Sequence, residues 1–201
     1  MENTKLIRSA IIIDRIFKIL QGFAVAGVIV AAIFIPLTAI FGEKIIASAG
    51  NLTIGVLKFH LSGAMENYLD FANIKTSIIV MLVGAILVSA ATWYGLKVLR
   101  EILSPMKEGQ PFAAGISDKV RKLAWTVLIG GGVAEVGTLI SEVSMTQAYR
   151  IDRLLNPELV ESFAYNYSLD LWFVGAALIL FFLSYVFRSG EALQKEADET
   201  L

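Results

Sequence analysis

Long runs of apolar residues dominate the pattern along this chain. Three of the runs contain no charged residue over 24, 21 and 17 consecutive positions, and a fourth is interrupted only by Glu135. A helix needs roughly 20 apolar residues to cross a bilayer core about 30 Å thick. The pattern therefore predicts an all-α membrane protein with four transmembrane helices, at residues 19–42, 75–98, 120–142 and 170–188.

Two other interpretations of the runs fit less well. Four such runs in a soluble domain would leave too little polar surface. The small residues at 47–49 resemble a signal-peptide cleavage site. The apolar run before them is far longer than the usual h-region of about 7–15 residues. We therefore expect an uncleaved first helix.

The basic residues between the runs predict the orientation. Twelve of the 17 lysines and arginines flank one side of the predicted spans and five flank the other. Because cytoplasmic loops carry the excess of basic residues, both termini are expected in the cytoplasm. The whole chain, residues 1–201, is then a single membrane domain. Its predicted external loops are residues 43–74 and 143–169, its cytoplasmic loop is residues 99–119 and its cytoplasmic tail is residues 189–201.

Several segments outside the spans carry local signals. Residues 5–18 form a basic amphipathic stretch, typical of an interfacial helix or a partner-docking helix. In the first external loop, apolar and polar residues alternate over 57–61, which indicates a strand, and residues 65–72 are compatible with a short helix. Gly109 is a natural C-cap for the second helix, and Ser117 followed by Asp118 is a start signal for the third.

Composition limits the chemistry that the chain can perform. Of its residues 56% are hydrophobic and 17% charged, and the net charge is −1. No global field attracts nucleic acid, and we expect no direct nucleic-acid binding. The absence of cysteine and the single histidine, His60, exclude disulfides, thiolate sites and a multi-histidine metal site within one chain. We find no catalytic constellation and expect no enzyme activity, metal or cofactor.

Glu135 is the sharpest single-residue signal. It shares one stripe of the third predicted helix with Thr138 and Glu142, and glycines 130–132 lie just before it. A carboxylate within a span is costly, so it is expected to face other helices. Three alternatives remain: a ligand, ion or proton site, structural polar packing, or a position near the outer interface. The glycines are expected to serve close helix packing.

Two cytoplasmic stretches carry a family resemblance. The first reads Gly109-Gln-Pro-Phe112, with Pro111 inside it, and the second covers residues 120–125. With a phenylalanine-rich last helix and the tail that follows it, the chain resembles the small bacterial membrane family called domain of unknown function 2975 (DUF2975). The resemblance implies a four-helix membrane protein, often paired with a small helix-turn-helix transcription regulator.

The tail is the most plausible partner-binding segment. Residues 192, 193, 196 and 197 keep helical spacing, so the last helix is expected to project about two turns beyond the membrane. The tail is solvated, docks on the basic central loop, or competes with DNA for the basic surface of a regulator. The candidate partner-binding residues are Gly109, Pro111, Phe112, Glu191, Leu193, Glu196 and Asp198.

These observations favour a non-enzymatic regulatory or sensory protein of the bacterial cytoplasmic membrane. It would lie in the lipid bilayer and hold a cytoplasmic partner such as a helix-turn-helix regulator. The alternative is a small transporter, channel or transport-complex subunit that uses Glu135. Self-association into a homo-oligomer would then assemble a ring of such carboxylates.

Overall fold

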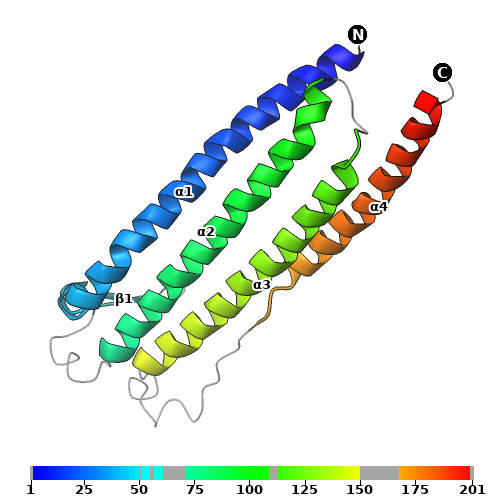
Figure 1. Cartoon of the computed structure of the whole chain (residues 1–201). Helices are drawn as coiled ribbons and strands as arrows, with labels where there is room; N and C mark the ends of the chain where they lie inside the picture. The colour runs from blue at the N-terminus through cyan, green and yellow to red at the C-terminus, as the bar shows by residue number, and fades with distance from the viewer. Residues whose placement is uncertain are drawn as a thin grey trace. The chain divides into compact units, whose positions relative to one another are not determined.

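A computed structural model shows four long helices among the residues that it describes. It describes residues 2–49, 51–54, 57–60, 71–108, 113–149 and 168–199. Figure 1 follows the helices in chain order. They are α1 (Glu2–Ala49), α2 (Phe71–Lys107), α3 (Ile116–Tyr149) and α4 (Trp172–Glu199).

All four helices are long and apolar enough to cross a membrane. The qualifying segments are Ile7–Gly42, Ala72–Lys107, Ile116–Ser144 and Trp172–Glu196. The helical class and the number of long apolar helices are thus as predicted, and these properties are those of a multi-pass membrane protein. Helices α1, α2 and α3 extend beyond both ends of their predicted spans, because regular hydrogen bonding continues into the polar flanks. Helix α4 begins two residues after the predicted start at 170 and continues past the predicted end at 188.

A short β-hairpin is the non-helical element of the described residues. Strands β1 (Asn51–Ile54) and β2 (Leu57–His60) pair antiparallel, with Asn51 opposite His60 and Ile54 opposite Leu57. The alternating pattern at residues 57–61 therefore marked a real strand. The short helix considered for residues 65–72 lies outside the described residues up to position 70, and α2 begins at Phe71.

Helix α1 buries small and polar residues and exposes large apolar ones. On α1 the buried positions include Ala10, Gln21, Ala24, Ala31 and Thr38. They recur at spacings of three, seven and eleven residues, which keeps them on one stripe. Phe23 and Ile40 of the same helix are 70% and 73% exposed. Membrane helices pack in this way, because lipid solvates large apolar side chains and small residues let the backbones approach.

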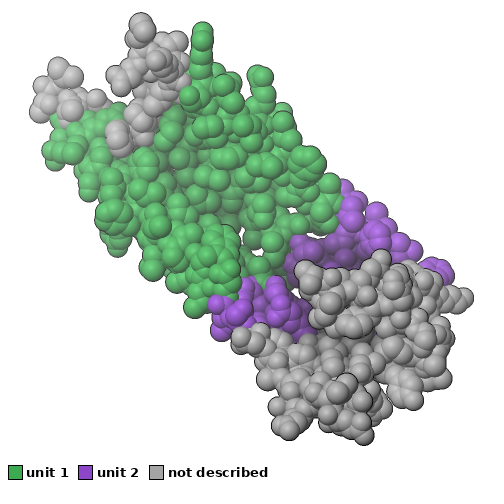
Figure 2. Space-filling view, turned by 180° about the vertical axis from the view of Figure 1, so that it is seen from behind, with its two compact units in different colours: residues 1–28, 87–134, 170–201 green, residues 29–86, 135–169 purple. Residues whose placement is uncertain are grey.

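The chain forms two compact units, coloured separately in Figure 2. Unit 1 contains Met1–Val28, Leu87–Ala134 and Asp170–Leu201, and unit 2 contains Ile29–Ile86 and Glu135–Leu169. In unit 2, Ile74 and Ser77 of α2 are almost fully buried, and Lys75 lies against Gly42 of α1. The clusters described below all belong to unit 1.

Parts of all four helices contribute to unit 1. Its apolar core joins the end of α2 to the start of α3 through Val98, Ile102, Ile116, Val120 and Leu123. Leu180 and Phe187 of α4 pack against this core. Trp125 of α3 meets Phe181 edge-on, with ring centroids 5.3 Å apart. The interior thus anchors the apolar part of α4.

Two of the three consecutive glycines of α3, Gly130 and Gly131, lie at close helix contacts, as expected. A Cβ added to Gly130 would lie 3.0 Å from Cβ of Ala91 in α2. A Cβ added to Gly131 would overlap Cβ and Cγ of Phe173 in α4. The absence of side chains at these two positions lets α3 approach both neighbours.

The helix boundaries near the central loop differ slightly from prediction. Helix α2 ends at Lys107, close to the predicted Gly109, and the amide of Glu108 donates to the Pro105 carbonyl. Helix α3 begins at Ile116 rather than after Ser117. Gly115, at φ +84°, precedes it and accepts the first helical hydrogen bond, from Lys119 N–H. Glycine tolerates that backbone conformation. Because α3 begins at Ile116, Ser117 lies inside its first turn.

Candidate functional site

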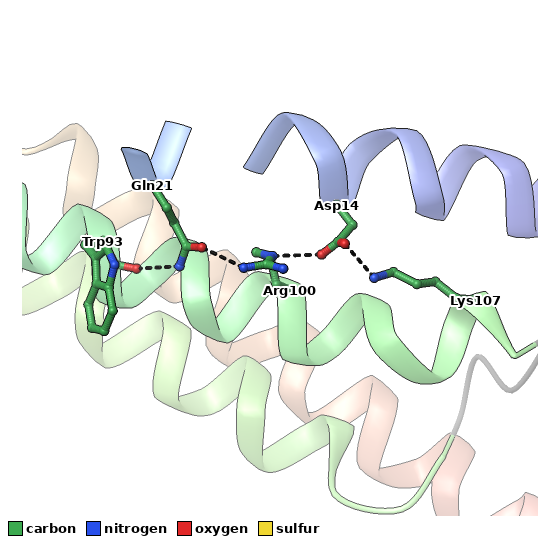
Figure 3. Close-up of polar contacts among 5 residues, drawn as sticks. All are labelled: Asp14, Gln21, Trp93, Arg100 and Lys107. Atoms are coloured by element: carbon green, nitrogen blue, oxygen red, sulfur yellow. Dashed lines mark hydrogen bonds and ion pairs between the residues drawn. The ribbon is translucent and has the colours of Figure 1, made fainter. Parts of the chain in front are cut away.

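Two polar clusters hold the helices of unit 1 together at the ends that adjoin the central loop. The first, which we call the Asp14 cluster, joins α1 to α2 (Figure 3). The carboxylate of Asp14 lies 2.8 Å from Arg100 Nε and 2.7 Å from Lys107 Nζ. All three side chains are at most one-third exposed. One carboxylate therefore pairs with two cations in a partly protected setting.

Gln21 extends the Asp14 cluster towards the apolar part of the helices. Its side-chain oxygen accepts a hydrogen bond from Arg100 Nη1 at 2.8 Å. Its amide nitrogen donates to the Trp93 carbonyl at 3.3 Å (Figure 3). The amide thus satisfies a backbone oxygen and a guanidinium together, although Gln21 is only 8% exposed.

Residue spacing explains how the Asp14 cluster forms. Asp14 and Gln21 are seven residues apart on α1, and Arg100 and Lys107 are seven apart on α2. Seven residues are almost two helical turns, so each pair shares one face. Arg100 contacts both Asp14 and Gln21, and Lys107 contacts Asp14. This order of contacts is that of two helices running antiparallel.

The second cluster, which we call the Ser117 cluster, joins α3 to α4. The amide of Ser117 donates to one carboxylate oxygen of Glu191 at 2.7 Å, and its hydroxyl donates to the other at 3.0 Å. The hydroxyl of Ser184 donates to the Ser117 carbonyl at 3.0 Å. Ser117 is 6% exposed, so these bonds lie in a protected contact.

Glu191 supplies the capping group that Gly115 cannot supply, because glycine has no side chain. The first amides of a helix have no partner within the helix, so a carboxylate can accept their hydrogen bonds. The positive end of the helix dipole also stabilises a negative charge at this position. Here the carboxylate comes from another helix instead of the preceding residue. The start of α3 and the end of α4 are consequently coupled.

The predicted partner-binding residues have separate locations. Gly109, Pro111 and Phe112 lie outside the described residues. Glu191 belongs to the Ser117 cluster, whereas Leu193 is 68% exposed and Glu196 is exposed.

The tail is helical along its described length. Helix α4 continues through Gly190 to Glu199, so the helical spacing predicted for the tail is confirmed, and its projection beyond the membrane stays a prediction. Asp198 lies in this part of α4, and its side chain is outside the description. Glu191 of the tail accepts hydrogen bonds from Ser117 at the start of α3. Solvation of the tail, docking on the central loop and competition with DNA stay predictions.

The predicted polar stripe around Glu135 is only partly sheltered. Glu135 is half-buried on α3, while Thr138 and Glu142 are exposed. The described residues contain no group of three or more metal-ligating side chains. Within unit 1, Phe173 at the start of α4 packs on Gly131, one helical turn before Glu135 along α3.

Sequence reasoning missed Asp14, Gln21 and Ser184. Arg100 and Lys107 counted only as basic residues that orient the chain. A signal for Asp14 and Gln21 exists in the stripe of small and polar positions on α1. Ser184 and Glu191 likewise lie seven residues apart on α4. Neither spacing identifies which helix provides the partner.

Comparisons with protein-family models, with curated proteins and with solved structures find no match to this chain.

Proposed function

We propose that this chain is a multi-pass protein of the bacterial cytoplasmic membrane that regulates a cytoplasmic partner without catalysing a reaction. Both termini and the central loop lie in the cytoplasm. The partner is held by the central loop and the tail, and a small helix-turn-helix transcription regulator of the kind implied by the resemblance to DUF2975 is the preferred candidate.

The contact between Glu191 and Ser117 carries this proposal. Glu191 belongs to the tail, and Ser117 follows the loop segment 109–112 by five residues. Ala113, the residue immediately after that segment, packs against the same core as Phe187. The tail and the residues that follow segment 109–112 are therefore anchored to one small region. A single soluble domain can contact both.

The exposed part of α4 supplies the surface for that contact. Leu193 is 68% exposed two residues after the anchoring Glu191. A large apolar side chain exposed beside acidic residues suits a partner surface with an apolar pocket and basic surroundings. A DNA-binding regulator presents such basic surroundings, and the acidic tail competes with DNA for them.

The two clusters give the protein elements that a signal can alter. The Asp14 cluster fastens α1 to α2, and the Ser117 cluster fastens α3 to α4. Each depends on a carboxylate and a few hydrogen bonds. Opening either cluster changes how the helices frame the central loop, and regulation requires two such arrangements with different affinities for the partner.

The transport alternative depends on Glu135. A polar pathway needs further polar groups beside it, and the neighbouring Thr138 and Glu142 are exposed on α3. Nothing in the described arrangement of α3 favours transport over regulation, so regulation is the function that we propose.

Crosslinking in cells tests the proposal. A photo-crosslinking amino acid replaces Leu193, and the captured protein is identified by mass spectrometry. We expect the intact chain to capture a DNA-binding regulator. This capture should be lost when the crosslinker at position 193 is combined with deletion of residues 194–201. Glu135→Gln, which keeps much of the hydrogen-bonding capacity of the acid, serves as the matched control and should retain capture.

Two results contradict the proposal. One is the absence of any specific partner in the intact, correctly inserted chain. The other is loss of capture in Glu135→Gln while the truncated chain retains it, which would transfer the function from the tail to the carboxylate within the predicted span.

A further inference from the structure

An apolar groove runs between α2 and α3 in unit 1. Its volume is about 320 Å³, and its walls include Val88 and Leu99 of α2, Leu123 and Ala134 of α3, and Trp172 at the start of α4. Thr92 and Thr126 also line it, but their hydroxyls donate to the Val88 and Lys122 carbonyls of their own helices. Both threonine hydroxyls thus donate within their own helices, and the groove offers an almost wholly apolar surface.

Basic side chains adjoin one end of this groove. Lys119 precedes Leu123 by one turn of α3, and its ammonium donates to the Glu101 carbonyl of α2 at 3.2 Å. That contact crosses from α3 to α2 two residues beyond Leu99. Lys122 is exposed and precedes the groove residue Thr126 by one turn. An ammonium has three donors, so Lys119 keeps capacity for an anion while it holds the carbonyl.

The length of the groove fits one leaflet of a bilayer. From Val88 to Leu99 the wall covers eleven helical steps, which is roughly 16 Å. Half of a hydrocarbon core about 30 Å thick is about 15 Å. The far end is bounded by Trp172, which neighbours the Phe173 that packs on Gly131. A chain that enters beside the lysines therefore ends at the indole.

We propose that this groove binds one acyl chain of an anionic phospholipid of the cytoplasmic leaflet, with the lipid phosphate on Lys119 and Lys122. The inference rests on the membrane location and orientation proposed above, but not on any protein partner. Apolar walls account for the acyl chain, and the two lysines that precede the groove residues of α3 account for the anionic headgroup.

Fluorescence quenching by brominated lipid tests the site. Trp93→Phe and Trp125→Phe leave Trp172 as the sole tryptophan of the chain. The protein is reconstituted into phosphatidylcholine vesicles that contain phosphatidylglycerol brominated near the end of its acyl chains, or brominated phosphatidylcholine at the same mole fraction. We expect the anionic lipid to quench Trp172 more strongly, with an apparent preference on the order of tenfold.

The lysines and the groove are then altered separately. The double variant Lys119→Gln with Lys122→Gln should abolish the preference for brominated phosphatidylglycerol. The matched double variant Lys18→Gln with Lys97→Gln removes the same charge from the same predicted interface. Lys18 is on α1, and Lys97 lies opposite the groove face of α2, with its ammonium 5.9 Å from the ring centroid of Trp93. This control should keep the preference.

Competition by unbrominated lipid, in the single-tryptophan protein that keeps all its lysines, tests the site without the lysine variants. Unbrominated phosphatidylglycerol should restore Trp172 fluorescence, and unbrominated phosphatidylcholine should not. Val127→Phe, which fills the groove from α3, should reduce quenching by both lipids. Equal quenching by the two brominated lipids, or a preference that survives removal of both lysines, overturns the site. Flotation with the vesicles verifies insertion, so a failure of membrane location is recognised independently.

Discussion

At the scale of single residues, the absence or presence of one side chain decides whether two helices meet. Gly130 and Gly131 let α3 approach α2 and α4, and Asp14 draws two cations of α2 onto α1. Both effects arise from small or polar residues, while large apolar residues of α1 such as Phe23 are turned outward. Substitutions at the small and polar positions are therefore the informative ones.

Gly131→Ala is expected to destabilise the protein. Its new Cβ would overlap Phe173, and overpacking of this kind typically costs about 1–3 kcal/mol. Alanine recovers up to about 1 kcal/mol through its higher helix propensity. We therefore expect a net loss on the order of 1 kcal/mol in the free energy of unfolding, measured by reversible denaturation in detergent micelles.

Gly132→Ala is the matched control for that substitution. A Cβ at this position would lie 4.0 Å from the nearest atom of Phe173, an ordinary contact. It should leave stability unchanged or raise it slightly. Equal destabilisation by the two alanines would show that the contact between Gly131 and Phe173 is not formed.

Asp14→Asn is expected to weaken the link between α1 and α2. The amide removes the negative charge between Arg100 and Lys107, and hydrogen bonds to charged groups are typically worth about 1.5–3 kcal/mol. Since the cluster is partly exposed, solvent screening reduces this contribution, and we expect a loss of roughly 1 kcal/mol in the free energy of unfolding.

The exposed pair Asp118–Arg121 provides the comparison for Asp14. Its side chains are 65% and 58% exposed, so Asp118→Asn should cost no more than about 0.5 kcal/mol. Unfolding in detergent at low and high salt measures both variants. If Asp14→Asn proves as mild as Asp118→Asn, the Asp14 cluster does not fasten the helices.

At the scale of elements, the four helices follow from the sequence, whereas their pairing does not. Runs of apolar residues are long enough to define each helix, and the alternation at residues 57–61 was sufficient for β2. Glu191 was identified as a tail residue, but its partner could not be predicted. The start of α3 depends on Gly115 and on a carboxylate 74 residues away from Ser117.

Glu191→Ala tests this coupling between elements. Loss of an N-terminal cap typically costs about 0.5–2 kcal/mol, so the first turn of α3 should open more readily. Hydrogen exchange should accelerate in the segment containing Ser117, with little change at the centre of α3. Glu196→Ala removes an exposed acid from the same helix and should leave that exchange rate unaltered. Identical exchange in the two variants would rule out capping by Glu191.

At the scale of the whole molecule, the central claim is that the Asp14 and Ser117 clusters mark the cytoplasmic end of a four-span membrane protein. The charge distribution supports this orientation, since both clusters lie beside the basic central loop. The tail, the loop and the lysines next to the groove then share one side of the membrane. The proposed partner binding and the proposed lipid selection both depend on that arrangement.

Accessibility of single cysteines measures this orientation directly in a chain that contains no cysteine of its own. The structure offers four exposed positions, Ala114 and Leu193 for the cytoplasmic side and Gln147 and Ser168 for the external side. With an impermeant thiol reagent on intact cells, Gln147→Cys and Ser168→Cys should be labelled, and Ala114→Cys and Leu193→Cys should react only after the membrane is opened. Labelling of Ala114→Cys or Leu193→Cys in intact cells, with the other two protected, would contradict the account.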